Sequence, residues 1–292
     1  MSLTTVAGKA SIGLMCATFK LSRAAYYAAG AAPAPRVSNV VALPKKPRYT
    51  AVEVVLAGVR RVIDGNPAWG VRKVWATLRA EGMKVSRKRI WAIMHAHGLV
   101  LARDSEPGEP RRGHVAVPEP NRRLATDLTT TWTRRDGVVA IVPTIDCGCR
   151  TALALEVTKD QHGPAVLASV ESALTAAFGS PGNVPDGLEL RTDHGPQYTG
   201  ADCEKLVDEW HLLHTYAPVG RPTGNAVVER FIRTMKEEVV WLRDWDSADE
   251  LRTALDAWVK RYNERRPHQS LAWKTPAAFR AEKLGIAHAK AA

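Results

Sequence analysis

Three carboxylates, Asp127, Asp193 and Glu229, occupy positions where a folded α/β chain would expose them. Asp127 falls in a Thr-rich extended segment, Asp193 closes a short predicted strand, and Glu229 lies in the first turns of a long predicted helix. A carboxylate in or at the end of a buried strand is costly to desolvate unless a cation compensates for its charge. Carboxylate oxygens suit hard ions such as Mg²⁺ or Mn²⁺, and three convergent carboxylates suit two ions about 3.5–4 Å apart, an arrangement that promotes phosphodiester displacement.

The spacing of these acids does not by itself define a site. Asp193 and Glu229 are separated by 35 residues, but 23 of the 169 residues after position 123 are acidic, so such pairs arise often by chance. Asp146 also follows a predicted strand, which makes it a rival for a place in the triad and otherwise a turn residue.

Alternating strands and helices are predicted around these acids. Strands are expected over 124–132, 138–146 and 152–157, with a turn at 147–150 joining the last two as an antiparallel pair. Further along, the pattern predicts a helix over 164–178, a strand over 188–192, a helix over 202–210, a strand over 212–216, a loop over 217–224, and helices over 225–241 and 247–262. This order indicates a three-layer α/β domain with a mixed sheet.

The basic charge is confined to the N-terminal part. The chain carries 41 Lys and Arg against 30 Asp and Glu, a net charge of +11. Residues 1–123 hold 21 basic and 7 acidic residues (net +14), and residues 124–292 hold 20 and 23 (net −3). This excess favours a polyanionic partner. A membrane span is excluded because no apolar run approaches the roughly 18–20 residues required, and we expect four reduced cysteines and no secretory signal.

The basic part is predicted to be helical. Val54, Val55, Val59 and Val62 mark one helix and 71–78 a second, and Ser86 is expected to cap a third. The third helix opens with Arg87, Lys88 and Arg89, in a helix-turn-helix arrangement that suits the major groove of DNA; a solvated helix face is the alternative. Trp69, Trp75 and Trp91 are interpreted as core. Residues 22–27 could begin a similar short helix.

Pro-rich stretches divide the chain. They predict an N-terminal helical segment with a linker over 1–47, a helix-turn-helix domain over 48–103, a linker over 104–120, a catalytic core with C-terminal helices over 121–280, and a tail over 281–292.

Several sequence blocks closely resemble the integrase-type transposases of bacterial insertion sequences, and retroviral integrases more distantly. The blocks are Ala125 to Thr129, Thr192 to Tyr198, Gly224 to Glu229 with Lys236, Tyr262 to Leu271, and Thr275-Pro276. The resemblance covers nearly the whole chain and points to the catalytic subunit encoded by the second frame of two-frame elements.

The resemblance implies a ribonuclease-H-like mixed-sheet core preceded by an all-helical helix-turn-helix region, with an Asp-Asp-Glu triad on Asp127, Asp193 and Glu229. It implies two Mg²⁺ (or Mn²⁺) ions on these carboxylates, and cutting and joining of double-stranded DNA at element ends and target. A homo-oligomer in the DNA complex, an upstream-frame helix-turn-helix partner or fusion, and a cytoplasmic, nucleoid-associated location in a bacterium are further expectations.

DNA contacts are expected from the following residues in addition to the basic triplet: Lys236, Asn225, Arg265, Arg266 and His268. Lys236 should share the helical face of Glu229, because seven residues make nearly two turns. Asn225 is first a helix cap or loop residue, and the last three could equally form a structural turn.

The sequence departs from the family pattern at Leu124, where an aromatic is usual, and at Cys149, where a Ser usually precedes the Arg. A non-catalytic DNA-binding regulator and a ribonuclease-H-like nuclease remain alternative functions, which an assay on element ends distinguishes.

Overall fold

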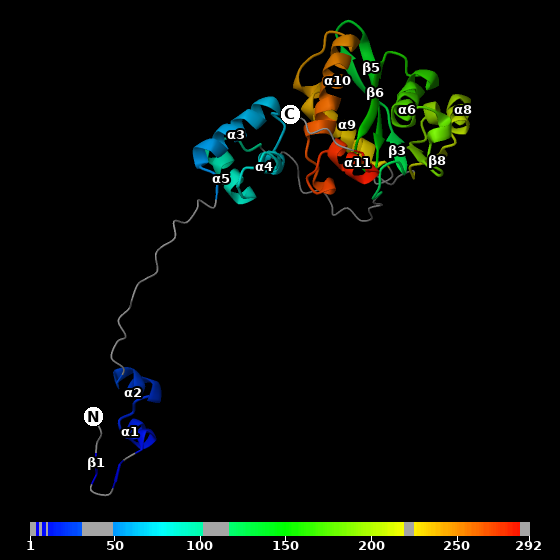
Figure 1. Cartoon of the computed structure of the whole chain (residues 1–292). Helices are drawn as coiled ribbons and strands as arrows, with labels where there is room; N and C mark the ends of the chain where they lie inside the picture. The colour runs from blue at the N-terminus through cyan, green and yellow to red at the C-terminus, as the bar shows by residue number, and fades with distance from the viewer. Residues whose placement is uncertain are drawn as a thin grey trace. The chain divides into compact units, whose positions relative to one another are not determined.

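The structure, a computed structural model, describes residues 4–5, 8–9, 11–30, 49–101, 117–218 and 225–286 (Figure 1). The chain divides into two units, residues 1–48 and residues 49–292. The Pro-rich linker expected before position 48 lies outside the described residues, whereas the helices that precede it are described. Most of the linker expected over 104–120, the loop over 217–224 and the end of the tail also lie outside them.

The first unit contains two short helices, α1 (Ile12–Thr18) and α2 (Arg23–Gly30), and a two-stranded pair, β1 (Thr4–Thr5) with β2 (Gly8–Lys9). Each helix has a serine cap: the Ser11 hydroxyl accepts from the Leu14 amide at 3.3 Å, and the Ser22 hydroxyl accepts from the Ala25 amide at 3.1 Å. A helix therefore does begin at residues 22–23, as expected.

Three helices, α3 (Val52–Gly65), α4 (Val71–Ala80) and α5 (Arg87–Ala96), form the basic part of the second unit and enclose their own apolar core. Ser86 caps α5 as predicted, accepting from the Arg89 amide at 3.3 Å. The helix predicted from the valine spacing is present as α3, although Val54 itself is exposed. The interpretation of Trp91 as core was wrong, since Trp91 is 50% exposed on the outer face of α5.

The remaining chain forms a six-stranded mixed sheet. Its strands are β3 (Arg123–Thr126), β4 (Thr129–Thr133), β5 (Gly137–Asp146), β6 (Ala152–Thr158), β7 (Glu189–Thr192) and β8 (Leu213–Tyr216). β5 pairs antiparallel with β6 on one edge and with β3 and β4 on the other, while β7 and β8 add to β3 in parallel. The register of β3 on β5 continues unchanged into β4, so the single strand expected over 124–132 is one extended path interrupted at residues 127–128.

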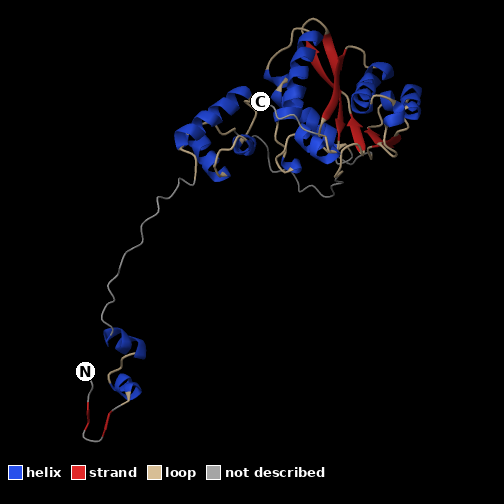
Figure 2. Ribbon diagram, viewed as in Figure 1, coloured by secondary structure: helices blue, strands red, loops and turns tan. Residues whose placement is uncertain are grey.

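Helices cover both faces of this sheet (Figure 2). Side chains alternate along β3: Leu124 packs with α6 (Gly163–Phe178) and α8 (Ala201–Glu209), whereas Ala125 packs in the cluster of α9 (Ala226–Glu238) and α10 (Ala248–Arg265). The described elements also include α7 (Pro196–Thr199), α11 (Pro276–Leu284) and three short 3₁₀ helices, η1 (Pro181–Asn183), η2 (Val240–Leu242) and η3 (Gln269–Leu271). The predicted fold class, a helical region before a three-layer α/β core, is confirmed.

All four cysteines are buried free thiols. Within the described ranges, no helix combines the length and the apolar character needed to cross a membrane.

Candidate active site

Asp127 lies in the interruption between β3 and β4, not inside a strand as expected. There its Oδ1 accepts a hydrogen bond from the Leu128 amide at 2.9 Å. Burial raises the pKa of Asp127, and although the Leu128 amide opposes this, the negative charges of Asp193 and Glu229 add to it and bring the pKa to about 6. The three carboxylates predicted from the sequence therefore interact electrostatically in the folded chain.

Asp193 follows β7, the strand that pairs in parallel with β3, so the sheet brings its carboxylate to the same edge as Asp127. Its Oδ1 accepts from the Gly195 amide at 2.9 Å, and its side chain is exposed. The next residue, His194, stacks on Tyr216 with ring centroids 4.8 Å apart. Tyr198 is buried, with its hydroxyl 3.4 Å from that of Thr126.

Helix α9 supplies Glu229 and Lys236. Its inner face buries Val228, Phe231 and Met235 against the sheet. At its N-terminus the Asn225 side chain does not cap the helix; its Nδ2 donates to the Thr126 carbonyl at 3.1 Å. This bond ties the start of the Glu229 helix to the residue that precedes Asp127.

A cleft of about 470 Å³ opens between β3–β4 and α9. Asp127 and Glu229 line it, together with Leu128, Thr129, Ile232, Arg233, Lys236 and Trp241. Lys236 lowers the pKa of Asp127, against burial and the neighbouring acids, so its ammonium group acts on the carboxylates as well as sharing the helical face of Glu229. The cleft is therefore acidic at one end and basic and aromatic at the other.

The donor set of this site fits a hard divalent cation. Its three side chains are all carboxylates, and a bound divalent cation would offset the repulsion between their negative charges. Among the described residues, no three His, Cys, Asp or Glu side chains stand close enough together to ligate one ion without adjustment.

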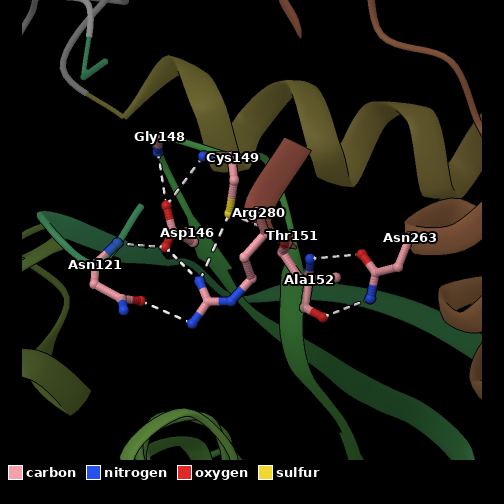
Figure 3. Close-up of polar contacts among 8 residues, drawn as sticks. All are labelled: Asn121, Asp146, Gly148, Cys149, Thr151, Ala152, Asn263 and Arg280. Carbon is pink, nitrogen blue, oxygen red and sulfur yellow. Dashed lines mark hydrogen bonds and ion pairs between the residues drawn. The ribbon is translucent and has the colours of Figure 1, made fainter. Parts of the chain in front are cut away.

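Asp146, the rival for the triad, does not line this cleft; it is the last residue of β5 and is fully buried, and Figure 3 shows its polar contacts. It accepts from the Asn121 and Gly148 amides, each at 2.8 Å, and from the Cys149 amide at 3.2 Å. Arg280 of α11 completes its set of partners at 2.9 Å. Asp146 is thus a turn residue that joins α11 to the sheet.

The basic triplet of α5 divides by exposure. Arg87 and Lys88 are exposed, whereas Arg89 is half-buried with its guanidinium 5.6 Å from the Tyr49 ring centroid. One turn further on, Trp91 stacks on His95 with ring centroids 4.9 Å apart, and both side chains are exposed. The outer surface of α5 is therefore both cationic and aromatic.

Arg266 and His268 have intramolecular partners. The Arg266 Nε donates to Glu238 at 3.1 Å, and the same carboxylate accepts from Lys73 of α4 at 2.8 Å and from the Trp258 indole at 3.1 Å. His268 Nε2 lies 3.2 Å from the Arg266 guanidinium, and burial together with that charge holds the pKa of His268 far below its usual value. These contacts favour the structural-turn alternative for both residues, while Arg265 is exposed at the end of α10.

Sequence reasoning missed Arg233, Trp241 and the Glu238 network. The first follows Glu229 by four residues, a helical spacing that could have placed it on the same face. The partners of Glu238 are 165 residues away in Lys73 and 28 away in Arg266, so no local pattern could reveal them.

Comparisons with known proteins agree with this arrangement. Residues 52–104 match the HTH-like domain family, and residues 117–222 and 211–276 match two families that are both described as integrase core domain. Transposase InsD for insertion element IS2A/D/F/H/I/K from Escherichia coli is 26% identical over 245 residues, which cover 80% of this chain and 81% of the relative. Transposase InsD for insertion element IS2D, from strain K12, matches with the same values.

Two solved structures are also similar. A simian T-cell lymphotropic virus intasome in complex with PP2A regulatory subunit B56 gamma matches with 17% identity and a TM-score of 0.46, over 80% of this chain and 79% of that one. The HTLV-2 integrase catalytic core domain in complex with magnesium matches with 15% identity and a TM-score of 0.40, over 56% of this chain and 97% of that one.

The chain therefore carries an HTH-like domain followed by an integrase core domain. It is a transposase, a homologue of the IS2 protein InsD. The resemblance seen in the sequence blocks is therefore confirmed.

Proposed function

We propose that this transposase binds the terminal repeats of its element through its helical region and cuts and joins DNA strands at the cleft, with Asp127, Asp193 and Glu229 as the catalytic carboxylates. The observation that supports this most directly is the electrostatic coupling of Asp127 to Asp193, Glu229 and Lys236 beside one cleft. A carboxyl whose pKa is raised by burial and by neighbouring acids is typical of functional sites.

The three carboxylates are proposed to hold Mg²⁺ or Mn²⁺, two ions per site, which would supply Lewis-acid stabilisation of an in-line phosphodiester displacement. The chain's own groups then have separate tasks. Lys236 attracts a DNA phosphate toward the acidic end of the cleft. Asp127, whose pKa is raised to about 6, would be ionised above that pH and could then bind a metal ion.

DNA recognition is proposed for the outer surface of α5, which presents Arg87 and Lys88 with Trp91 and His95. The exposed cations would bind phosphates and base edges in the major groove. Arg89 contributes less directly, since it packs over Tyr49. Of the later motif, exposed Arg265 is proposed as a DNA contact, and Arg266 and His268 as groups that position it.

The remaining expectations are carried forward as part of the proposal. The proposal includes domain boundaries near residues 47, 103, 120 and 280. It also includes a homo-oligomer on DNA, an upstream-frame helix-turn-helix partner or fusion, and a cytoplasmic, nucleoid-associated location in a bacterium. The HTH-like match over 52–104 and the core matches from 117 onward support the two central boundaries.

The test uses duplex oligonucleotides that carry the inverted repeats flanking the gene. Wild-type protein with Mg²⁺ or Mn²⁺ should nick these ends and join them to target DNA, and Asp193→Asn should abolish both steps. Asp256→Asn, at an exposed position on α10, is the matched control and should retain activity. An Asp193→Asn protein that still joined DNA ends would refute the triad.

Either of two other results would support a different function. Binding of the ends without cutting by the wild type would indicate a non-catalytic regulator. Preferential cutting of RNA·DNA hybrids would indicate a ribonuclease.

A further inference from the structure

Trp241 is an exposed aromatic side chain in the wall of the active-site cleft. It is 65% exposed and lines the same cleft as Asp127 and Glu229. An exposed tryptophan in the wall of a cleft presents a large flat face on which a planar partner can stack.

The backbone under Trp241 is fixed. Val239 and Val240 are buried in the sheet core, and the Val240 carbonyl accepts from the Trp245 indole at 3.0 Å. Because the residue before Trp241 is anchored in this way, the Trp241 ring is presented outward on the short η2 helix. Because this backbone is already ordered, stacking of a flat partner would cost only the side-chain entropy of Trp241.

The groups around the ring are cationic. The Lys236 ammonium lies 6.0 Å from the Trp241 ring centroid, and Arg233 lines the same wall. Arg233 also pairs with Glu237 at 2.7 Å, so its charge is partly compensated, which leaves Lys236 as the main anion-attracting group beside the ring. A flat ring next to an ammonium group matches one nucleotide, with the base on the ring and the phosphate on the cation.

We propose that Trp241 stacks on an unpaired nucleobase of the DNA strand next to the phosphodiester that is cut. This inference rests on the proposed function, since it assigns a base-binding subsite to the same cleft. The cleft of about 470 Å³ is within the usual size range of small-molecule sites, which is the scale of one nucleotide. The stack would orient the strand so that the adjoining phosphate lies between Lys236 and the carboxylates.

The experiment measures single-turnover cleavage of element-end duplexes by wild-type protein and by Trp241→Ala and Trp241→Phe. Stacking on an aromatic side chain predicts a loss of about 5- to 150-fold in Trp241→Ala and retention of most activity in Trp241→Phe. Trp132→Ala is the matched control, because Trp132 is 57% exposed on β4 and does not line the cleft. All three variants should keep the wild-type melting temperature.

A second set of duplexes carries one abasic position at a time near the cleavage point. At one position the missing base should slow the wild type by about the same factor as Trp241→Ala, and should not slow the Trp241→Ala protein further. Independent losses at every position would overturn the inference, as would full activity of Trp241→Ala. Altered sedimentation of Trp241→Ala with unchanged sensitivity to the abasic position would assign the ring to a protein interface instead.

The same experiments distinguish failure of the proposed function from failure of the base-binding subsite. A wild-type protein that cuts none of these duplexes with Mg²⁺ or Mn²⁺ would overturn both, whereas normal cutting with no effect of Trp241→Ala would overturn the subsite alone.

Discussion

Replacing Asp127 with Asn should stabilise the metal-free protein at neutral and alkaline pH. Burial and the neighbouring acids raise the pKa of Asp127 from 3.8 to about 6. That difference corresponds to about 3 kcal/mol between the two protonation states. Because the side chain is only half-buried, water screens part of this energy, and we expect a gain of about 1–2 kcal/mol, or about 2–8 °C in melting temperature.

The pH dependence of the Asp127 charge determines whether Asp127→Asn is more or less stable than the wild type. The folded protein holds the Asp127 proton more tightly than the unfolded chain, so the carboxyl favours folding below about pH 4 and that contribution is lost as pH rises through about 6. The advantage of Asp127→Asn over the wild type should therefore be largest at pH 8 and about half as large at pH 5. Asparagine can still accept the Leu128 amide, so the local turn is retained.

The assay is urea unfolding in EDTA at pH 5 and pH 8, with Asp256→Asn as the control for the loss of an exposed carboxylate. Adding Mg²⁺ at pH 8 should stabilise the wild type and have a smaller effect on Asp127→Asn. A variant that is less stable than the wild type at pH 8, or whose advantage does not grow between the two pH values, would refute the reasoning.

Three other predictions concern the rest of the chain. Glu238→Gln should cost about 3–5 kcal/mol in urea unfolding, because it removes the carboxylate that the half-buried Lys73 and the buried Arg266 both bind; a change below about 1 kcal/mol would contradict this. Gly148→Ala should cost about 3 kcal/mol or more, since the added Cβ would lie 1.9 Å from the Glu119 carbonyl oxygen; Gly182→Ala, which meets no atom, is the neutral control in the same melts. Lys88→Gln should lower the slope of log affinity against log salt by about 1 in anisotropy titrations with element-end DNA, and an unchanged slope would remove Lys88 from the interface.

The fold was predictable because the local sequence patterns indicate the same helices and strands that the hydrophobic core requires. The Thr-rich segment predicted to be extended forms β3 and β4, and Leu124 and Ala125 alternate between the two faces of β3. The hydroxyl of Ser86 caps α5 in the way that its position before a helical run indicated. Trp91 was misjudged because tryptophan is buried on average, whereas its place on α5 is opposite the Ile90 and Met94 face.

The acidic residues of the candidate site were identified from the sequence, whereas the aromatic residue in the cleft wall, Trp241, was not. The helix expected to run to Trp241 ends at Glu238, and Val239 leaves helical geometry at φ −139° and ψ −63°. This early end places Trp241 on a separate turn and brings it to the cleft. A sequence pattern does not fix the last turn of a helix, because fraying and capping depend on tertiary contacts.

Helix α9 changes how mutants of this transposase should be interpreted. Glu229 and Lys236 face the cleft from this helix, and nine residues after Glu229 the same helix ends at Glu238, which Lys73 of the HTH-like part binds. A substitution of Lys73 will therefore disturb the helix that carries Glu229, the proposed catalytic acid, although Lys73 lies on α4 among residues that a geneticist would assign to DNA recognition. Screens that score only transposition frequency will group such variants with active-site mutants. Separate measurements of DNA retention and strand cutting will be needed to tell them apart.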